Sequence, residues 1–203
     1  MPRRPDLHRR AELASAAFEV LRTRGVQTSM RELADALGVK RPTLYFYFPD
    51  LGSVFESVLD QMYQQLADVV VARVRAETHP LDRLRVVVEA TVEFHRERPQ
   101  LISGLLQLWS VAGRDFASVM DRERRIGEMS RAALISDLRA GIARKEVLPC
   151  DPERIVGTVL ALLSGVLVHH VLGIARPDGV IEELAERIIE PLRPKKKKAR
   201  KRS

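Results

Sequence analysis

The stretch "SMRELADALGVKRPTLYFYF", residues 29–48, contains the signals that decide the fold of the first part of the chain. Ser29 is followed three residues later by Glu32, which is the spacing of a capping box at the start of a helix. Gly38 ends that helix, and Pro42 suits the first turn of another, because its missing N–H would have no partner there anyway. We therefore expect two short helices joined by a tight turn.

A longer helix is expected just before this stretch. Residues 12–25, "ELASAAFEVLRTRG", carry apolar side chains at helical spacing, and Gly25 would end the helix. The apolar positions are Leu13, Ala16, Ala17, Val20 and Leu21. A longer helix followed by two short helices with a glycine-containing turn is a helix-turn-helix arrangement.

The second short helix ends in aromatic residues, although aromatic residues make up only 5% of the chain. Leu44 and Phe48 lie four residues apart, so they share one helix face and are expected to pack inward. If the helix enters the major groove of DNA with its N-terminal end first, Arg41 would meet a guanine edge or a phosphate, and rings would contact thymine methyl groups. The alternative is that Tyr45 and Phe46 pack inside the protein.

These residues resemble the DNA-binding signature of TetR-family transcriptional regulators over about Ala11 to Leu59. The motifs "TSMRELA", "LGV" and "TLYFYF" carry the resemblance. It implies that DNA is contacted by nine residues: Thr28, Ser29, Lys40, Arg41, Pro42, Thr43, Tyr45, Phe46 and Tyr47.

Two features depart from the family pattern, and the first is the loop "GVQTS", residues 25–29, which is one residue shorter than expected. The family usually has a lysine just after the cap of the fourth helix, where it meets a phosphate, and this chain has Leu51 followed by Gly52. That phosphate contact is therefore expected to be missing. The candidates to replace it are Arg3, Arg4, Arg9, Arg10 and the basic C-terminal tail.

Charge is distributed unevenly along the 203 residues, whose net charge is +7. Residues 1–50 carry a net charge of +3 and residues 51–192 a net charge of −4, while "RPKKKKARKR" at 193–202 contains eight cations. This asymmetry favours a polyanionic partner for the front of the chain. We expect a DNA-binding domain at 1–50, a regulatory and dimerisation domain at 51–192, and a disordered tail at 193–203 that strengthens nonspecific DNA binding or, less simply, meets acidic lipid or RNA.

The fold class expected for the chain is all-α, with about nine helices. A three-helix helix-turn-helix domain comes first, and a helical ligand-binding and dimerisation domain follows. The six helices expected after residue 50 cover residues 51–76, 81–98, 101–112, 116–145, 152–174 and 179–191.

The last two helices are expected to form a homodimer. Small residues such as Gly157 and Gly165 would let a neighbouring helix approach, and paired copies would make a four-helix bundle. The expected contacts are Leu160, Leu163, Leu167, Val171, Ile181, Leu184 and Ile188. A two-fold dimer would place two recognition helices in successive major grooves, about 34 Å apart.

The resemblance also implies a pocket for a small apolar or amphipathic ligand. The candidate lining residues are Met62, Leu66, Phe94, His95, Leu105, Trp109, Phe116, Met120 and Met129, although such residues at helical spacing are also typical of a core. No metal or other cofactor is expected. His169 and His170 are adjacent, so they point about 100° apart on a helix and do not readily share one ion.

Other function classes find little support. No phosphate-binding loop, "HExxH" motif or nucleophile elbow is present, so an enzyme is not expected. Residues 155–175 are long enough to span a bilayer, but a buried bundle or interface helix is the preferred interpretation. The single cysteine, Cys150, is consistent with the cytoplasm.

The sequence thus predicts a homodimeric repressor that binds a palindromic operator in double-stranded DNA and is released by a ligand. One alternative is a non-inducible or architectural DNA-binding protein of the same fold, whose body (the domain expected at residues 51–192) docks a protein partner. Another is a membrane-attached regulator that uses residues 155–175.

Overall fold

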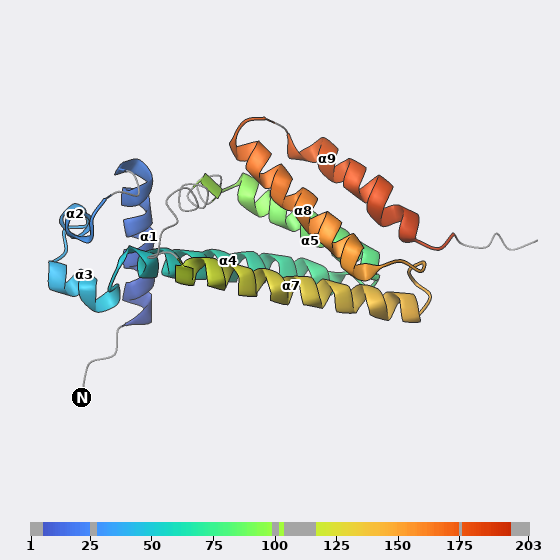
Figure 1. Cartoon of the computed structure of the whole chain (residues 1–203), viewed down its shortest axis with the longest axis horizontal. Helices are drawn as coiled ribbons and strands as arrows, with labels where there is room; N and C mark the ends of the chain where they lie inside the picture. Colours follow the sequence, from blue (N-terminus) through green and yellow to red (C-terminus); the bar gives the residue numbers. More distant parts are fainter. Residues whose placement is uncertain (1–5, 25–27, 99–101, 104–116, 175, 196–203) are drawn as a thin grey trace, which may run out of the picture. The chain divides into compact units, whose positions relative to one another are not determined.

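The described part of the chain consists of helices (Figure 1). The structure is a computed structural model, and it describes residues 6–24, 28–98, 102–103, 117–174 and 176–195. The expected all-α class is confirmed, with eight α-helices in those ranges. The helix expected at 101–112 lies almost wholly outside them. The chain divides into two compact units, Met1–Asp68 with Arg98–Gly127, and Val69–Glu97 with Glu128–Ser203.

The first unit contains the predicted helix-turn-helix. Its helices are α1 (Leu7–Arg24), α2 (Met30–Ala36), α3 (Arg41–Tyr47) and the first part of α4 (Leu51–Ala76). Asp50 begins α4 as expected, because its Oδ1 accepts a hydrogen bond of 2.7 Å from the Ser53 N–H.

The start of α4 packs on α1 within this unit. The rings of Phe18 and Phe55 meet edge to face, with centroids 6.4 Å apart. The Ser15 hydroxyl donates to Gln61 at 3.0 Å, and the Gln61 amide donates to the Ala11 carbonyl at 3.2 Å. These contacts join the first part of α4 to α1, so the compact unit extends past the expected division at residue 50.

The second unit is a helical bundle. It contains α5 (Pro80–Arg96), the second part of α7 (Ala117–Ala143), α8 (Pro152–Val171) and α9 (Pro177–Leu184). Helix α5 packs against both α8 and α9, and Arg83 joins α5 to α7 through an ion pair of 3.1 Å with Asp137. Pro80, Pro152 and Pro177 each stand at the start of a helix, where no N–H is needed.

Helices α8 and α9 end before the expected boundaries, and the other described helix ends after residue 50 differ by at most two residues. Helix α8 ends at Val171 instead of 174, because Gly173 adopts a left-handed backbone with φ +68° and the Ile174 N–H bonds back to the His169 carbonyl. Helix α9 ends at Leu184 and continues as a π-helical turn (Ala185–Ile189) and a 3-10 turn (Glu190–Leu192). Pro191 has no N–H to continue an α-helical ladder there.

Helix α8 is the one described helix that is long and apolar enough to cross a membrane, judged by length and composition alone. Within the second unit it buries one face, whose residues are Val156, Val159, Leu163, Val166 and Leu167. That burial against α5 and α9 is typical of a bundle helix.

Two glycines in α7 provide a test of the packing of this helix. A Cβ on Gly141 would lie 2.7 Å from the Pro80 ring and 2.8 Å from a Val147 methyl group, whereas a Cβ on Gly127 would meet nothing within 4 Å. We expect Gly141→Ala to lower the free energy of unfolding by about 1–3 kcal/mol, because the proline ring cannot move aside easily. Gly127→Ala should raise it by about 0.5–1 kcal/mol through helix propensity. Urea denaturation measures both, and an equal gain in stability would contradict the packing.

Candidate nucleic-acid interface

The start of α2 is fixed by the predicted capping box. The Ser29 hydroxyl accepts from the Glu32 N–H at 3.3 Å, and the Glu32 carboxylate accepts from the Ser29 N–H at 2.8 Å. The same carboxylate accepts from the Ser29 hydroxyl at 2.7 Å. These hydrogen bonds favour the charged form and lower the pKa of Glu32 below its ordinary value.

The turn after α2 depends on Gly38. This residue has a left-handed backbone with φ +63°, a conformation that side chains disfavour. The Gly38 N–H bonds to the Asp35 carbonyl at 3.3 Å, and the Val39 N–H bonds to the Ala34 carbonyl at 3.1 Å. This is a Schellman motif, and it redirects the chain into α3 over two residues.

The inner face of α3 is fully buried. Leu44 and Phe48 have no exposed surface, and neither does Leu33 of α2. Helices α2 and α3 are in contact. The predicted inward packing of Leu44 and Phe48 is therefore confirmed, and it fixes which way the opposite face of α3 points.

The outer face of α3 is exposed. Tyr45 and Phe46 are 48% and 47% exposed, which argues against the alternative that they are packed inside the unit. The side chains of Arg41, Pro42 and Thr43 are exposed at the N-terminal end of the helix. Lys40 is the exposed N-cap residue, and Tyr47 is half-buried with its ring edge to face against Phe46, centroids 5.2 Å apart.

Two of the nine candidate contacts are placed differently. Thr28 is buried, with 8% of its surface exposed, and the Ser29 hydroxyl is bonded to Glu32. Both residues therefore contribute to the start of α2 rather than presenting a free side chain. Asp35, which the sequence analysis did not single out, lies 3.8 Å from the Arg41 guanidinium. No periodic signal indicates that pair, because it joins two helices across the turn.

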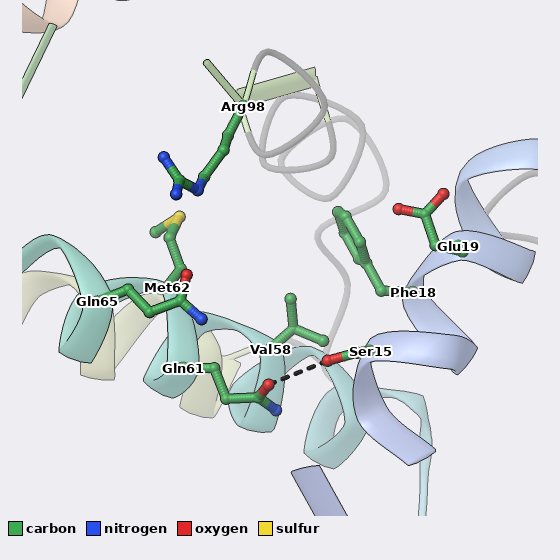
Figure 2. A pocket seen from close by; sticks show the side chains of 8 residues that line it. All are labelled: Ser15, Phe18, Glu19, Val58, Gln61, Met62, Gln65 and Arg98. Carbon is green, nitrogen blue, oxygen red and sulfur yellow. Dashed lines mark hydrogen bonds between the residues drawn. The ribbon is translucent and has the colours of Figure 1, made fainter. Parts of the chain in front are cut away.

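A cavity of about 250 Å³ lies between α1 and α4 in the first unit (Figure 2). The cavity is lined by both apolar and polar side chains. The lining residues are Ser15, Phe18, Glu19, Val58, Gln61, Met62, Gln65 and Arg98. Met62 is the one candidate pocket residue among them. Leu66 is half-buried and does not line this cavity.

The other pocket candidates are not gathered around this cavity. Phe94 and His95 are buried in α5 of the second unit, where the His95 Nδ1 lies 2.8 Å from the Thr91 carbonyl. Met129 is 74% exposed on α7, so its side chain lies at the surface instead of lining a pocket. Leu105, Trp109 and Phe116 lie outside the described residues, as does the side chain of Met120.

The expected dimer contacts fall on two faces of α8 and α9. Leu163, Leu167 and Leu184 are 7%, 8% and 4% exposed, because they pack inside their own bundle. Leu160, Val171, Ile181 and Ile188 are half-buried. The face that α8 leaves exposed carries Thr158, Ala161, Leu162 and His169, about half a turn from the expected leucines.

Two family profiles match most of the chain. Residues 13–58 match the N-terminal domain described as "Bacterial regulatory proteins, tetR family", and residues 80–194 match the domain described as "BetI-type transcriptional repressor, C-terminal". The chain belongs to the TetR family. It is therefore a DNA-binding transcriptional regulator with a helix-turn-helix, in a family that is not enzymatic.

Relatives within and around this family differ in their described roles. The chain is 37% identical over 93 residues to the HTH-type transcriptional activator FasR of Mycolicibacterium smegmatis, a match over 45% of this chain and 42% of FasR. The chain spans about half the length of the first curated relatives that it matches. It is 24% identical to the nucleoid occlusion factor SlmA of a Marinomonas species, over 80% of this chain and 83% of SlmA.

A solved structure shares the fold. AibR in complex with isovaleryl coenzyme A and operator DNA superposes with a TM-score of 0.62 at 19% identity, over 92% of this chain and 98% of AibR. At this identity the likeness shows the TetR-family fold.

Proposed function

We propose that this TetR-family regulator is a cytoplasmic homodimeric repressor that binds a palindromic operator and leaves it when a small apolar or amphipathic ligand binds its body. The observation that carries the DNA-binding part is the outer face of α3. A helix with a fully buried inner face presents Arg41, Thr43, Tyr45 and Phe46 to the outside. Two rings that are about half exposed on a short helix leave apolar surface available to a partner outside the unit.

Arg41 is the residue that we assign to base or phosphate contact. It stands in the first turn of α3, where the positive end of the helix dipole also lies. Its pairing with Asp35 at 3.8 Å is long, and both side chains are about half exposed. Such a surface pair is weak, so the guanidinium can exchange Asp35 for a guanine edge or a phosphate.

We assign the dimer contact to the exposed face of α8 together with α9. Thr158, Ala161 and Gly165 are small and follow helical spacing, so a partner helix could approach closely. Leu162, at 38% exposed, supplies apolar area on the same face. A two-fold axis through this face would pair two copies of α3 on one duplex.

The ligand part of the proposal is supported by the presence of isovaleryl coenzyme A in the AibR structure. It is also supported by the cavity between α1 and α4, whose lining combines apolar and polar side chains as small-molecule sites do. Helix α4 is continuous from Leu51 to Ala76, so it begins beside α3 in sequence and ends in the second unit. A ligand that favours one position of α4 would change the spacing of the two recognition helices. The effect cannot exceed the difference in ligand affinity between the two states.

A second candidate function is a non-inducible DNA-binding protein whose body docks a protein. The match to a nucleoid occlusion factor over 80% of this chain supports this second candidate. Under this alternative the two units would act as a DNA anchor and a docking surface, and no small molecule would alter DNA affinity.

The basic tail is proposed to add nonspecific attraction to DNA. Arg193, its first cation, is bonded to Glu190 at 3.0 Å and paired with Asp82, so the root of the tail is tied to the second unit. The Arg193 pKa is raised, first by the hydrogen bond to Glu190. Seven further cations follow it in residues 195–202 and would neutralise phosphates on duplex DNA.

Arg41→Ala tests the DNA-contacting face. We expect DNA affinity to fall by about 1–3 kcal/mol, because a guanidinium contact to base or phosphate is lost. Fluorescence anisotropy on a duplex that the wild-type protein retains at 150 mM salt measures the change. Arg139→Ala, which removes an exposed arginine paired with Glu153 in the second unit, is the matched control and should have little effect. Equal losses for the two variants would contradict the assignment of α3.

Leu162→Arg tests the dimer face. A charge that lies at the surface of a free subunit would become buried in the interface, at a cost of several kcal/mol. We expect this variant to be a folded monomer by light scattering at micromolar concentration. Met129→Arg, at another exposed apolar position in the second unit, should remain dimeric. If Leu162→Arg also remains dimeric, the subunits meet elsewhere.

Acyl-CoA thioesters of different chain length separate the two candidate functions. A ligand-released repressor should lose DNA affinity when one of them binds, by a factor of about 5–150, which is the usual range of allosteric coupling. The free thiol coenzyme A is the control for the acyl group. A thioester that binds the protein, by calorimetry, without changing DNA affinity would contradict release by this ligand class.

A further inference from the structure

Arg10 is held against the end of the recognition helix. Its guanidinium carbon lies 5.3 Å from the centroid of the Phe48 ring, which is a cation–π distance. Phe48 is fully buried and is the C-cap residue of α3, where its N–H bonds to the Leu44 carbonyl at 2.8 Å. Figure 1 shows the first turns of α1, which carry Arg10, beside the end of α3 that leads into α4. Arg10 therefore lies at this corner of the first unit.

The Arg10 guanidinium lies over the Phe48 ring, but no carboxylate of the described residues pairs with it. Its neighbours His8 and Arg9 both approach the Glu12 carboxylate, at 3.3 Å and 2.9 Å. The guanidinium of Arg10 has no carboxylate partner anywhere in the described ranges of the chain. A guanidinium that lies over a ring can still donate hydrogen bonds from its N–H groups to an anion.

Neither the C-terminal end of α3 nor the start of α4 supplies a cation at the corner that Arg10 occupies. Between Arg41 and Arg73 the sequence contains no lysine, arginine or histidine, so the whole of α3 after its first residue and most of α4 lack positive charge. Leu51 is the first residue of α4. The Asp50 carboxylate beside it is engaged with the Ser53 N–H. A phosphate that comes to the C-terminal end of α3 must therefore meet a cation from another element.

We propose that Arg10 is a phosphate-binding residue for duplex DNA, held by Phe48 so that its charge serves the corner between α3 and α4. This inference rests on the proposed insertion of α3 into the major groove, with Arg41 at one end of the helix. Arg10 would then bind a backbone phosphate near the other end. Phosphate contacts of this kind fix the position of a recognition helix and contribute equally to all sequences.

Arg10→Gln removes the charge and keeps a polar side chain. The measurement is the dependence of log K on log[salt], on a retained duplex and on a duplex of unrelated sequence. We expect affinity for both duplexes to fall about tenfold at low salt, since hydrogen bonds to charged groups are the stronger ones. The salt slope should become shallower by about 0.9, the change expected for one lost phosphate contact. Arg9→Gln is the matched control, because Arg9 is already paired with Glu12.

A rescue experiment separates a DNA contact from a packing role. Leu51 is half-buried at the start of α4, three residues after Phe48, so Leu51→Lys would supply a cation at the same corner. Added to Arg10→Gln, it should restore the salt slope. A variant Arg10→Gln that binds DNA less tightly with an unchanged slope and a lower melting temperature would show that Arg10 only packs on Phe48, and would overturn the inference.

The result for Arg41→Ala distinguishes a failure of the proposed function from a failure of the role proposed for Arg10. If Arg41→Ala weakens binding while Arg10→Gln changes neither affinity nor slope, the proposed function stands and the role of Arg10 is wrong. If Arg41→Ala has no effect, or the wild-type protein retains no duplex, α3 does not enter the groove and both proposals fail.

Discussion

The complete burial of Leu44 and Phe48 is the constraint on which the rest of the first unit depends. A seven-residue helix has little stability of its own, so its packing decides both that it forms and which way it faces. With these two side chains against the unit, Tyr45 and Phe46 must point out. The same Phe48 ring also carries Arg10. One buried face thus determines the positions of the groups in the first unit that we assign to DNA.

Backbone chemistry at the two ends of α2 sets the angle of approach. The capping box fixes where α2 begins, and the left-handed Gly38 fixes where it ends. Only Val39 and Lys40 then remain before α3, so there is little freedom in how the two helices cross. The dependence on local signals explains why the motif can be recognised from a short stretch of the sequence. It also explains why Ser29, an expected DNA contact, is used instead to hold the helix start.

Elements with local signals were predictable, and elements that depend on packing were not. The start and end of α4, Leu51 and Ala76, follow from the Asp50 cap and from helical periodicity, and the structure has the same limits. The side of α8 that faces its own bundle could not be chosen from sequence, because apolar residues lie all around that helix. Met129 looked like a pocket residue for the same reason, since composition does not say whether an apolar side chain meets a neighbour. The contact of Arg10 with Phe48 joins residues 38 positions apart, and no local pattern indicates it.

Selection of bound duplexes from a random library tests the central claim most directly, namely that a dimer presents two copies of α3 to DNA. The account predicts an inverted repeat whose half-site centres lie about one helical turn, or a small multiple of it, apart. The same selection with Arg41→Ala should lose or relax one symmetric pair of positions while leaving the spacing unchanged. Enrichment of a single asymmetric site, or of no sequence at all above background, would contradict the account.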